Sequence, residues 1–123
     1  MFDKSTIVEK LKSYFSTKQE IKFAYLFGSV ASDKAFSLSD IDIAVMCSKK
    51  CNVMELMAQL SYLLKFDEVE VVDLSQTHNL RLIKEIIQKG IVLKDSPTRE
   101  EWELQKYHQA LDFINHTKVI YGY

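Results

Sequence analysis

The sequence contains little of what holds small proteins together covalently. Among 123 residues there are two cysteines, one proline and three glycines. A chain of this length can bury enough surface to fold without disulfides or a structural metal, so we expect Cys47 and Cys51 to be two ordinary, mostly buried thiols. A zinc site would need two further soft ligands at tight spacing, and the three histidines are too scattered to supply them.

Long apolar runs are also missing. No stretch approaches the roughly 20 apolar residues that a membrane span requires, and the first four residues lead directly into an amphipathic pattern rather than a signal peptide. The expected location is therefore cytoplasmic, with no membrane contact. The formal net charge is −1, whereas proteins that wrap nucleic acid usually carry a basic excess. Direct nucleic-acid binding is accordingly not favoured.

What the sequence does contain is a regular alternation of helix and strand patterns. The length corresponds to one domain, residues 1–123. Helical spacing of apolar side chains and runs of β-branched or aromatic residues predict, in turn, helices over 4–17, 51–65, 78–89 and 98–119 and strands over 21–27, 40–47, 68–74 and 91–93. A further turn of helix is expected within 29–36. The fold class is therefore α/β (α+β), a mixed sheet of about four strands with flanking helices.

Two of the predicted helices carry more specific expectations. The inward side of the helix over 78–89 is predicted to consist of Leu80, Ile83 and Ile87, and Gly90 is predicted to end it. A narrow apolar stripe along the long C-terminal helix consists of Leu104, Tyr107, Leu111 and Ile114. This stripe either packs on the chain's own domain, which is favoured, or contacts another helix.

One constellation of residues points to chemistry. Gly28-Ser29 ends the strand predicted over 21–27, and ten residues later Asp40-Ile41-Asp42 opens the next strand. Residues i and i+2 of a strand face the same side, so Asp40 and Asp42 present two carboxylates together. Mg²⁺ relieves their repulsion, because it prefers carboxylate and phosphate oxygens. Glycine lets the backbone approach a triphosphate, and N–H groups at the start of a following helical turn favour an anion.

Gly28-Ser29, ten residues, and Asp40-x-Asp42 together resemble the motif of the DNA-polymerase-β-like nucleotidyltransferases. The length and the later segment Val69-Glu70-Val71-Val72-Asp73-Leu74 are similar to the minimal nucleotidyltransferase (MNT, MntA-like) branch, with the resemblance covering roughly residues 5–95. It implies a polymerase-β-like nucleotidyltransferase fold and a two-ion Mg²⁺ site. It also implies transfer of a nucleoside monophosphate, AMP from ATP, to an acceptor hydroxyl.

The resemblance assigns roles by position. The metal-binding and catalytic residues would be Asp40, Asp42 and one later acid, and the nucleotide-binding residues would be Gly28, Ser29 and Ser39. There is one departure. Members of the family often have Ala-Arg-Gly soon after Gly-Ser, where this chain has Ala31-Ser32-Asp33. An arginine that contacts phosphate is therefore missing, and Asp33 adds negative charge near the triphosphate, which raises the question of lowered activity.

The later acid is either Glu70 or Asp73. These two residues have opposite parity, so a regular strand cannot point both into one site. The family's third acid lies early in this strand with apolar residues after it, which favours Glu70 as the third metal ligand. Asp73 stays the alternative, and outside the site it would cap the following helix.

The resemblance also implies a partner. Minimal nucleotidyltransferases form one half of two-gene modules whose other half is a helical HEPN-family toxin RNase. The implied function is that of an antitoxin that adenylylates a tyrosine of this toxin. The alternative is a binding antitoxin or regulator that masks its HEPN partner with little or no catalysis. A homo-oligomer, the acceptor and the nucleobase preference are left open by the sequence.

Overall fold

The computed structural model describes residues 4–31 and 40–121, with all side chains in these ranges except those of residues 29, 30 and 113–121. Helices and strands alternate along it in the order α1 (Lys4–Ser16), β1 (Ile21–Phe27), α2 (Gly28–Ala31), β2 (Ile41–Cys47), α3 (Val53–Leu64), β3 (Val69–Asp73), α4 (Leu80–Lys89), β4 (Ile91–Lys94) and α5 (Pro97–Tyr121). The predicted types and order are confirmed. Apart from α2, whose predicted range runs into residues outside this description, the ends shift by one or two residues.

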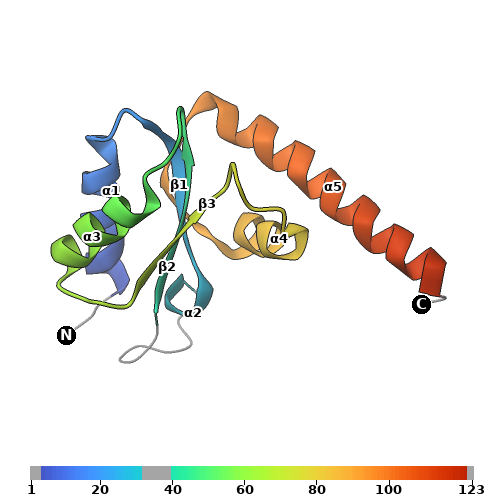
Figure 1. Cartoon of the computed structure of the whole chain (residues 1–123), viewed down its shortest axis with the longest axis horizontal. Coiled ribbons are helices and arrows are strands. Elements are labelled where there is room, and N and C mark those ends of the chain that lie inside the picture. The colour runs from blue at the N-terminus through green and yellow to red at the C-terminus, as the bar shows by residue number, and fades with distance from the viewer. Residues whose placement is uncertain (1–3, 32–39, 122–123) are drawn as a thin grey trace.

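The four strands form one mixed sheet in the order β3-β2-β1-β4. β1 pairs antiparallel with β2 and with β4, whereas β2 and β3 are parallel. A parallel pair needs a crossover connection, and α3 supplies it between β2 and β3 (Figure 1). As a consequence, β1 ends at the same end of the sheet at which β2 and β3 begin.

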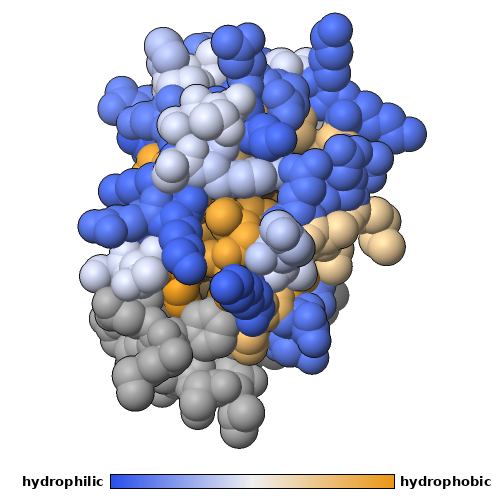
Figure 2. Space-filling model, turned by 90° about the vertical axis from the view of Figure 1, so that its left-hand side faces the viewer, coloured by the Kyte–Doolittle hydropathy of each residue, from blue (hydrophilic) through white to orange (hydrophobic). Residues whose placement is uncertain are grey.

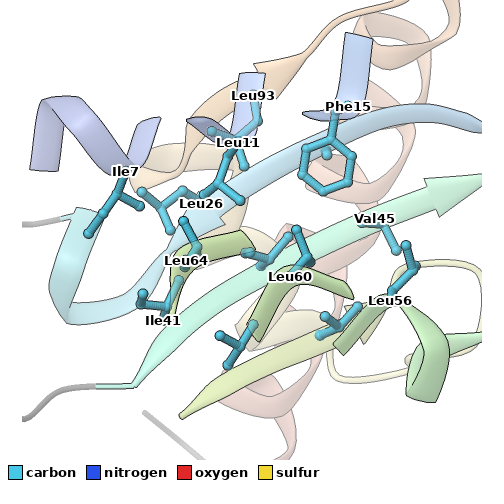
Figure 3. Packing of buried hydrophobic residues seen from close by; sticks show 14 of the residues in the cluster. Ile7, Leu11, Phe15, Leu26, Ile41, Val45, Leu56, Leu60, Leu64 and Leu93 are labelled. Carbon is cyan, nitrogen blue, oxygen red and sulfur yellow. The ribbon is translucent and has the colours of Figure 1, made fainter. Parts of the chain in front are cut away.

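Helices cover both faces of this sheet. Figure 1 shows α1 and α3 on one side and α4 and α5 on the other. Alternate strand side chains enter the two buried clusters that result. The larger cluster, on the side of α1 and α3, includes Ile7, Leu11, Phe15, Leu26, Ile41, Val45, Leu56, Leu60, Leu64 and Leu93 (Figure 3). The smaller cluster, on the side of α4 and α5, consists of Phe23, Tyr25, Phe27, Ala44, Leu74 and Ile86.

The favoured packing of the C-terminal stripe on the chain's own domain is wrong for two of its members, whereas contact of this stripe with another helix stays a prediction. The side chain of Ile114 lies outside the description. Leu104 is 63% exposed and Leu111 is 37% exposed. The helix instead packs through Trp102, whose ring centroid lies 5.3 Å from that of Phe23, and through the buried Ala110. The reason is that one large aromatic side chain fits the aromatic surface of β1, and its contact decides the rotation of the helix.

Polar groups reinforce this docking of α5. The hydroxyl of Tyr25, on β1, donates to Glu103 Oε2 at 2.5 Å, and Arg99 Nη1 donates to the same oxygen at 2.7 Å. Burial and then this carboxylate raise the pKa of the Tyr25 phenol, so the tyrosine stays a neutral donor. Although α5 spans 25 residues, no helix in the described ranges is long and apolar enough to cross a membrane.

The inward side of α4 also differs slightly from the prediction. Ile83 is buried as predicted, but Ile86 takes the second buried position, while Leu80 and Ile87 are only partly buried. Because α4 packs against both the sheet and α5, its buried side includes Ile86 rather than Ile87. Gly90 ends the helix, but with a φ of −70°. A Cβ there would lie 2.4 Å from the carbonyl oxygen of Ile86, so close approach and not a left-handed turn requires the glycine.

The expectation of two free thiols is wrong, because Cys47 and Cys51 form a disulfide. Cys47 is the last residue of β2, and Cys51 lies just ahead of α3. The turn between them brings their Cα atoms to 5.7 Å, within the usual range for a disulfide. Spacing in the sequence could not show this, since the path of the turn depends on where α3 packs.

The outer surface of α1 and α3 is mainly hydrophilic, with apolar atoms visible between the polar side chains (Figure 2). Two large side chains of α3 stand exposed there, Met54 at 76% and Tyr62 at 87%. Tyr62 contributes to a shallow groove between the two helices that Tyr14 also lines. This face is opposite the one that carries the residues described next.

Candidate active site

The pairing of β1, β2 and β3 in the sheet brings three predicted site residues together. At the end where β1 stops, Phe27 pairs with Asp42 of β2, and Asp42 pairs with Glu70 of β3. Gly28 follows Phe27 directly. The glycine turn, the second aspartate and the glutamate are therefore neighbours across three strands, although up to 42 positions separate them in the sequence.

Alternation along the strands tells which face these carboxylates occupy. Asp42 faces the same side of the sheet as Ala44, and Glu70 faces the same side as Val72, because residues two apart on a strand share a face. Ala44 belongs to the cluster beneath α4 and α5, and Val72 packs against it. Asp42 is half-buried and Glu70 is exposed. The two acids thus point to the side of α4 and α5, next to each other and open to solvent.

Asp73 lies elsewhere. It pairs with Val45, three residues along β2 from Asp42, and has the parity of Val71, which enters the cluster on the opposite face. Its Oδ1 accepts hydrogen bonds from the backbone N–H of Ser75 at 3.0 Å and from the Ser75 hydroxyl at 2.7 Å. Asp73 therefore shapes the turn after β3. The cap of α4 is Asn79, whose side chain accepts from the N–H of Leu82.

Gly28 is required by its neighbour Asp42. Its φ is 80°, in the region that side chains rarely adopt, and a Cβ on it would lie 2.3 Å from Asp42 Oδ2. The carboxylate therefore lies directly against the backbone of the turn. The short helix α2 starts at this glycine, and Lys4 Nζ donates to the carbonyl of Ala31 at 2.9 Å, which ties the end of α2 to α1.

The remaining predicted residues are placed only in part. Asp40 precedes β2 and is exposed. Ser29 belongs to α2, but its side chain is outside the description. Ser39 and Asp33 both lie outside the described residues.

Negative charge is concentrated around Asp42. Burial, followed by the charges of Asp40, Glu70 and Glu85, raises the pKa of Asp42 to about 6 from an ordinary value of 3.8. Among the described residues, the charges that act on Asp42 all belong to carboxylates, and each disfavours a second negative charge. Metal-free, this carboxylate is held in an electrostatically unfavourable position.

A divalent cation fits the chemistry of this donor set. Mg²⁺ takes carboxylate oxygens, often only one or two, and fills its other positions with water and substrate phosphates. Within the described ranges no three His, Cys, Asp or Glu side chains are grouped closely enough to hold a metal ion as they stand. Side-chain rotation or oxygens from a bound nucleotide would complete a metal site among these residues.

Sequence reasoning missed Glu85, on α4. Leu82, three residues earlier on the same side of the helix, packs against the smaller cluster beneath α4 and α5. Glu85 is exposed, and its charge acts on Asp42. No pattern in the sequence could have found it, because a single glutamate on the outer side of a helix is what any amphipathic helix shows.

The sequence also matches a known protein family. Residues 9–99 match the family described as Polymerase beta, Nucleotidyltransferase. No curated protein matches the chain by sequence.

Several solved structures share the fold. A chain in the crystal structure of a toxin–antitoxin with AMP-PNP superposes with a TM-score of 0.68 at 21% identity, covering 96% of this chain and 91% of that one. A chain in the complex of tri-AMPylated Shewanella oneidensis HEPN toxin with MNT antitoxin gives 0.66 at 21% identity, with 95% and 91% covered. A chain of the toxin–antitoxin MntA-HepT gives 0.60 at 22%, with 94% and 87% covered. At these identities the similarity establishes the fold.

Proposed function

The chain belongs to the polymerase beta nucleotidyltransferase family, and from this we propose that it transfers AMP from ATP to a protein hydroxyl in a Mg²⁺-dependent reaction. The proposed acceptor is a tyrosine of a HEPN-family toxin RNase, so that the chain acts in the cytoplasm as the antitoxin of a HEPN/MNT module. The observation that carries this proposal is the meeting of Gly28, Asp42 and Glu70 at one end of the sheet.

Asp40, Asp42 and Glu70 are the residues that would hold Mg²⁺. When bound, the metal supplies positive charge that neutralises the phosphates and polarises the reacting oxygens. The pKa of Asp42, raised to about 6 by burial and by its acidic neighbours, supports this assignment, because a cation would offset a repulsion that nothing else described around it offsets. Glu70 is preferred over Asp73 because it shares a face and a register pair with Asp42.

The chain's own groups would bind and orient the reactants. Gly28 lets the backbone of the turn reach the position of the triphosphate, directly beside the Asp42 carboxylate. In the transfer, the acceptor oxygen bonds to the α-phosphorus of ATP as the bond from that phosphorus to the pyrophosphate oxygen breaks. The proton of the acceptor hydroxyl passes to water or to one of the site carboxylates, Asp40, Asp42 or Glu70. Holding these groups in one place lowers the entropic part of the barrier.

Two observations support a protein as the acceptor. Asp40 and Glu70 are exposed, so a tyrosine on another protein can reach the reacting groups without entering a deep pocket. The structural neighbours include an MNT antitoxin in complex with a tri-AMPylated HEPN toxin and a toxin–antitoxin with AMP-PNP. A nucleotide and a modified toxin thus accompany this fold in related structures.

The test uses the purified chain, Mg²⁺, ATP labelled at the α-phosphate and the proposed partner, a HEPN-family protein, which we expect a neighbouring gene to encode. We expect label on the partner, none when the label is at the γ-phosphate, and none when EDTA replaces Mg²⁺. Asp40→Ala combined with Asp42→Ala should abolish labelling. A matched control is Glu101→Ala combined with Asp112→Ala, which removes two exposed acids from α5 and should leave labelling unchanged.

The outcomes separate the alternatives. Labelling that survives in the double aspartate variant would contradict the assigned site. A double variant that transfers no label but still neutralises the toxin in cells would favour the binding antitoxin. Separate replacement of Glu70 and Asp73 by Ala decides the third acid, since only loss of Glu70 should reduce transfer at least 100-fold, a magnitude typical of a catalytic group.

A further inference from the structure

The disulfide lies far from the proposed active site and has a cavity of its own. Cys47 ends β2, whereas Asp42 is the second residue of that strand, a separation of about 17 Å at the rise of a β-strand. Both cysteines line an open cavity of about 190 Å³, together with Lys18, Lys49 and Lys50. Small molecules in solution can therefore reach these two residues, which are partly buried.

The backbone on either side of the disulfide is anchored without it. Cys47 pairs with Ile21 of β1, and the N–H of Ser48 donates to the carbonyl of Glu20 at 2.8 Å. The start of α3 is capped by Asn52, whose side chain accepts from the N–H of Glu55 at 3.1 Å. Breaking the S–S bond would leave both sulfur atoms in place, and a bond that closes so short a loop constrains the unfolded chain least.

The cavity that both cysteines line has more basic than acidic side chains. Three lysines and two glutamates line the cavity, and one of these glutamates, Glu55, already accepts hydrogen bonds from the side-chain amides of Asn52 and Gln59. Ammonium groups near a cysteine stabilise its thiolate, the form that reacts. The same groups attract small anions.

We propose that Cys47 and Cys51 form an exchangeable disulfide that reacts, in the folded protein, with small anionic thiols of the glutathione type. An external thiolate attacks one sulfur, the Cys47–Cys51 bond breaks, and the other cysteine leaves as a thiolate. A second external thiolate attacks the mixed disulfide, which releases the oxidised external disulfide and the second cysteine thiolate. Two external thiols are thus oxidised as one protein disulfide is reduced, and glutathione disulfide reverses the sequence.

The experiment measures the rate of reduction of the native 123-residue chain by mercaptoethanesulfonate, an anionic thiol, and by cysteamine, a cationic one. Thiols are trapped with N-ethylmaleimide and counted by intact mass, with rates corrected for the thiolate fraction of each reagent. We expect the anionic thiol to react about 3- to 10-fold faster at low salt, with the preference shrinking as salt is added. Glutathione disulfide should restore the bond while the circular dichroism of the folded chain persists.

Charge reversal tests the part played by the lysines. Lys49→Glu combined with Lys50→Glu should remove or invert the preference for the anionic thiol. Lys10→Glu combined with Lys12→Glu makes the same charge change on exposed positions of α1 outside the cavity and should keep it. Equal rates for both thiols in the native chain, or reduction only at denaturant concentrations that unfold it, would overturn the proposal. Cys47→Ser with Cys51→Ser should fold and show neither reaction.

Discussion

Replacing the second aspartate of the motif should stabilise the protein. Asp42 is half-buried among Asp40, Glu70 and Glu85, and its pKa is raised to about 6, first by burial and then by these charges. Without a metal, the folded state therefore carries an ionised carboxylate where a neutral group is preferred. Asp42→Asn keeps the shape and removes the charge, so we predict a larger free energy of unfolding for the variant at neutral pH in EDTA.

The magnitude follows from the pKa. A rise from 3.8 to about 6 corresponds to about 3 kcal/mol for a fully shielded group. Because the side chain remains half-exposed, solvent screens a large part of this. We therefore expect Asp42→Asn to raise the free energy of unfolding by about 1 to 2 kcal/mol.

The direction of the pKa shift determines how the stability penalty changes with pH. The pKa of Asp42 is higher in the folded than in the unfolded chain, so the folded state binds its proton more tightly and ionisation weakens the fold. Below about pH 3 the carboxyl is protonated in both states, and the penalty is absent. It grows between about pH 4 and 6 and is complete above about pH 7. The difference between variant and wild type should follow the same course.

The assay is urea denaturation followed by circular dichroism at pH 4 to 8, in EDTA and then in Mg²⁺ with a non-hydrolysable ATP analogue. Asp112→Asn, at an exposed position on α5, is the matched control and should change stability little at any pH. Mg²⁺ with nucleotide should stabilise the wild type and not Asp42→Asn. The reasoning is refuted if the free energy of unfolding of Asp42→Asn exceeds that of the wild type by no more at pH 7.5 than at pH 4.

Three further predictions concern the turn at Gly28, the packing of α5 and the charge of Glu85. Gly28→Ala should cost about 2 to 3 kcal/mol, because its Cβ would meet the Asp42 carboxylate at 2.3 Å and φ is 80°; urea denaturation checks this, and a loss under 0.5 kcal/mol would contradict it. Trp102→Ala should cost about 2 to 4 kcal/mol through lost packing on β1, whereas Leu104→Ala, 63% exposed, should cost less than about 0.5 kcal/mol in the same assay. Glu85→Gln removes a charge that raises the pKa of Asp42, so the NMR titration midpoint of Asp42 should fall, and an unchanged midpoint would place Glu85 outside the site.

Much of this protein can be predicted from local patterns. Element types and order follow from periods of two and 3.6 residues, which are properties of neighbouring residues alone. The glycine turn at Gly28 and the placement of Asp42 on the next strand could be predicted for the same reason, since both depend only on short-range geometry. The opposite parity of Glu70 and Asp73 likewise showed that a regular strand directs only one of them to the site.

Tertiary structure decided the questions that need long-range contacts. Which acid lies beside Asp42 depended on the register between β2 and β3, and the charge of Glu85 depended on how α4 lies along the sheet. The disulfide depended on the turn between β2 and α3. The side on which α5 packs was chosen by Trp102 against β1, and not by the most regular stripe of leucines. Local sequence sets which face of an element is apolar, but the partner surface sets which part of it is buried.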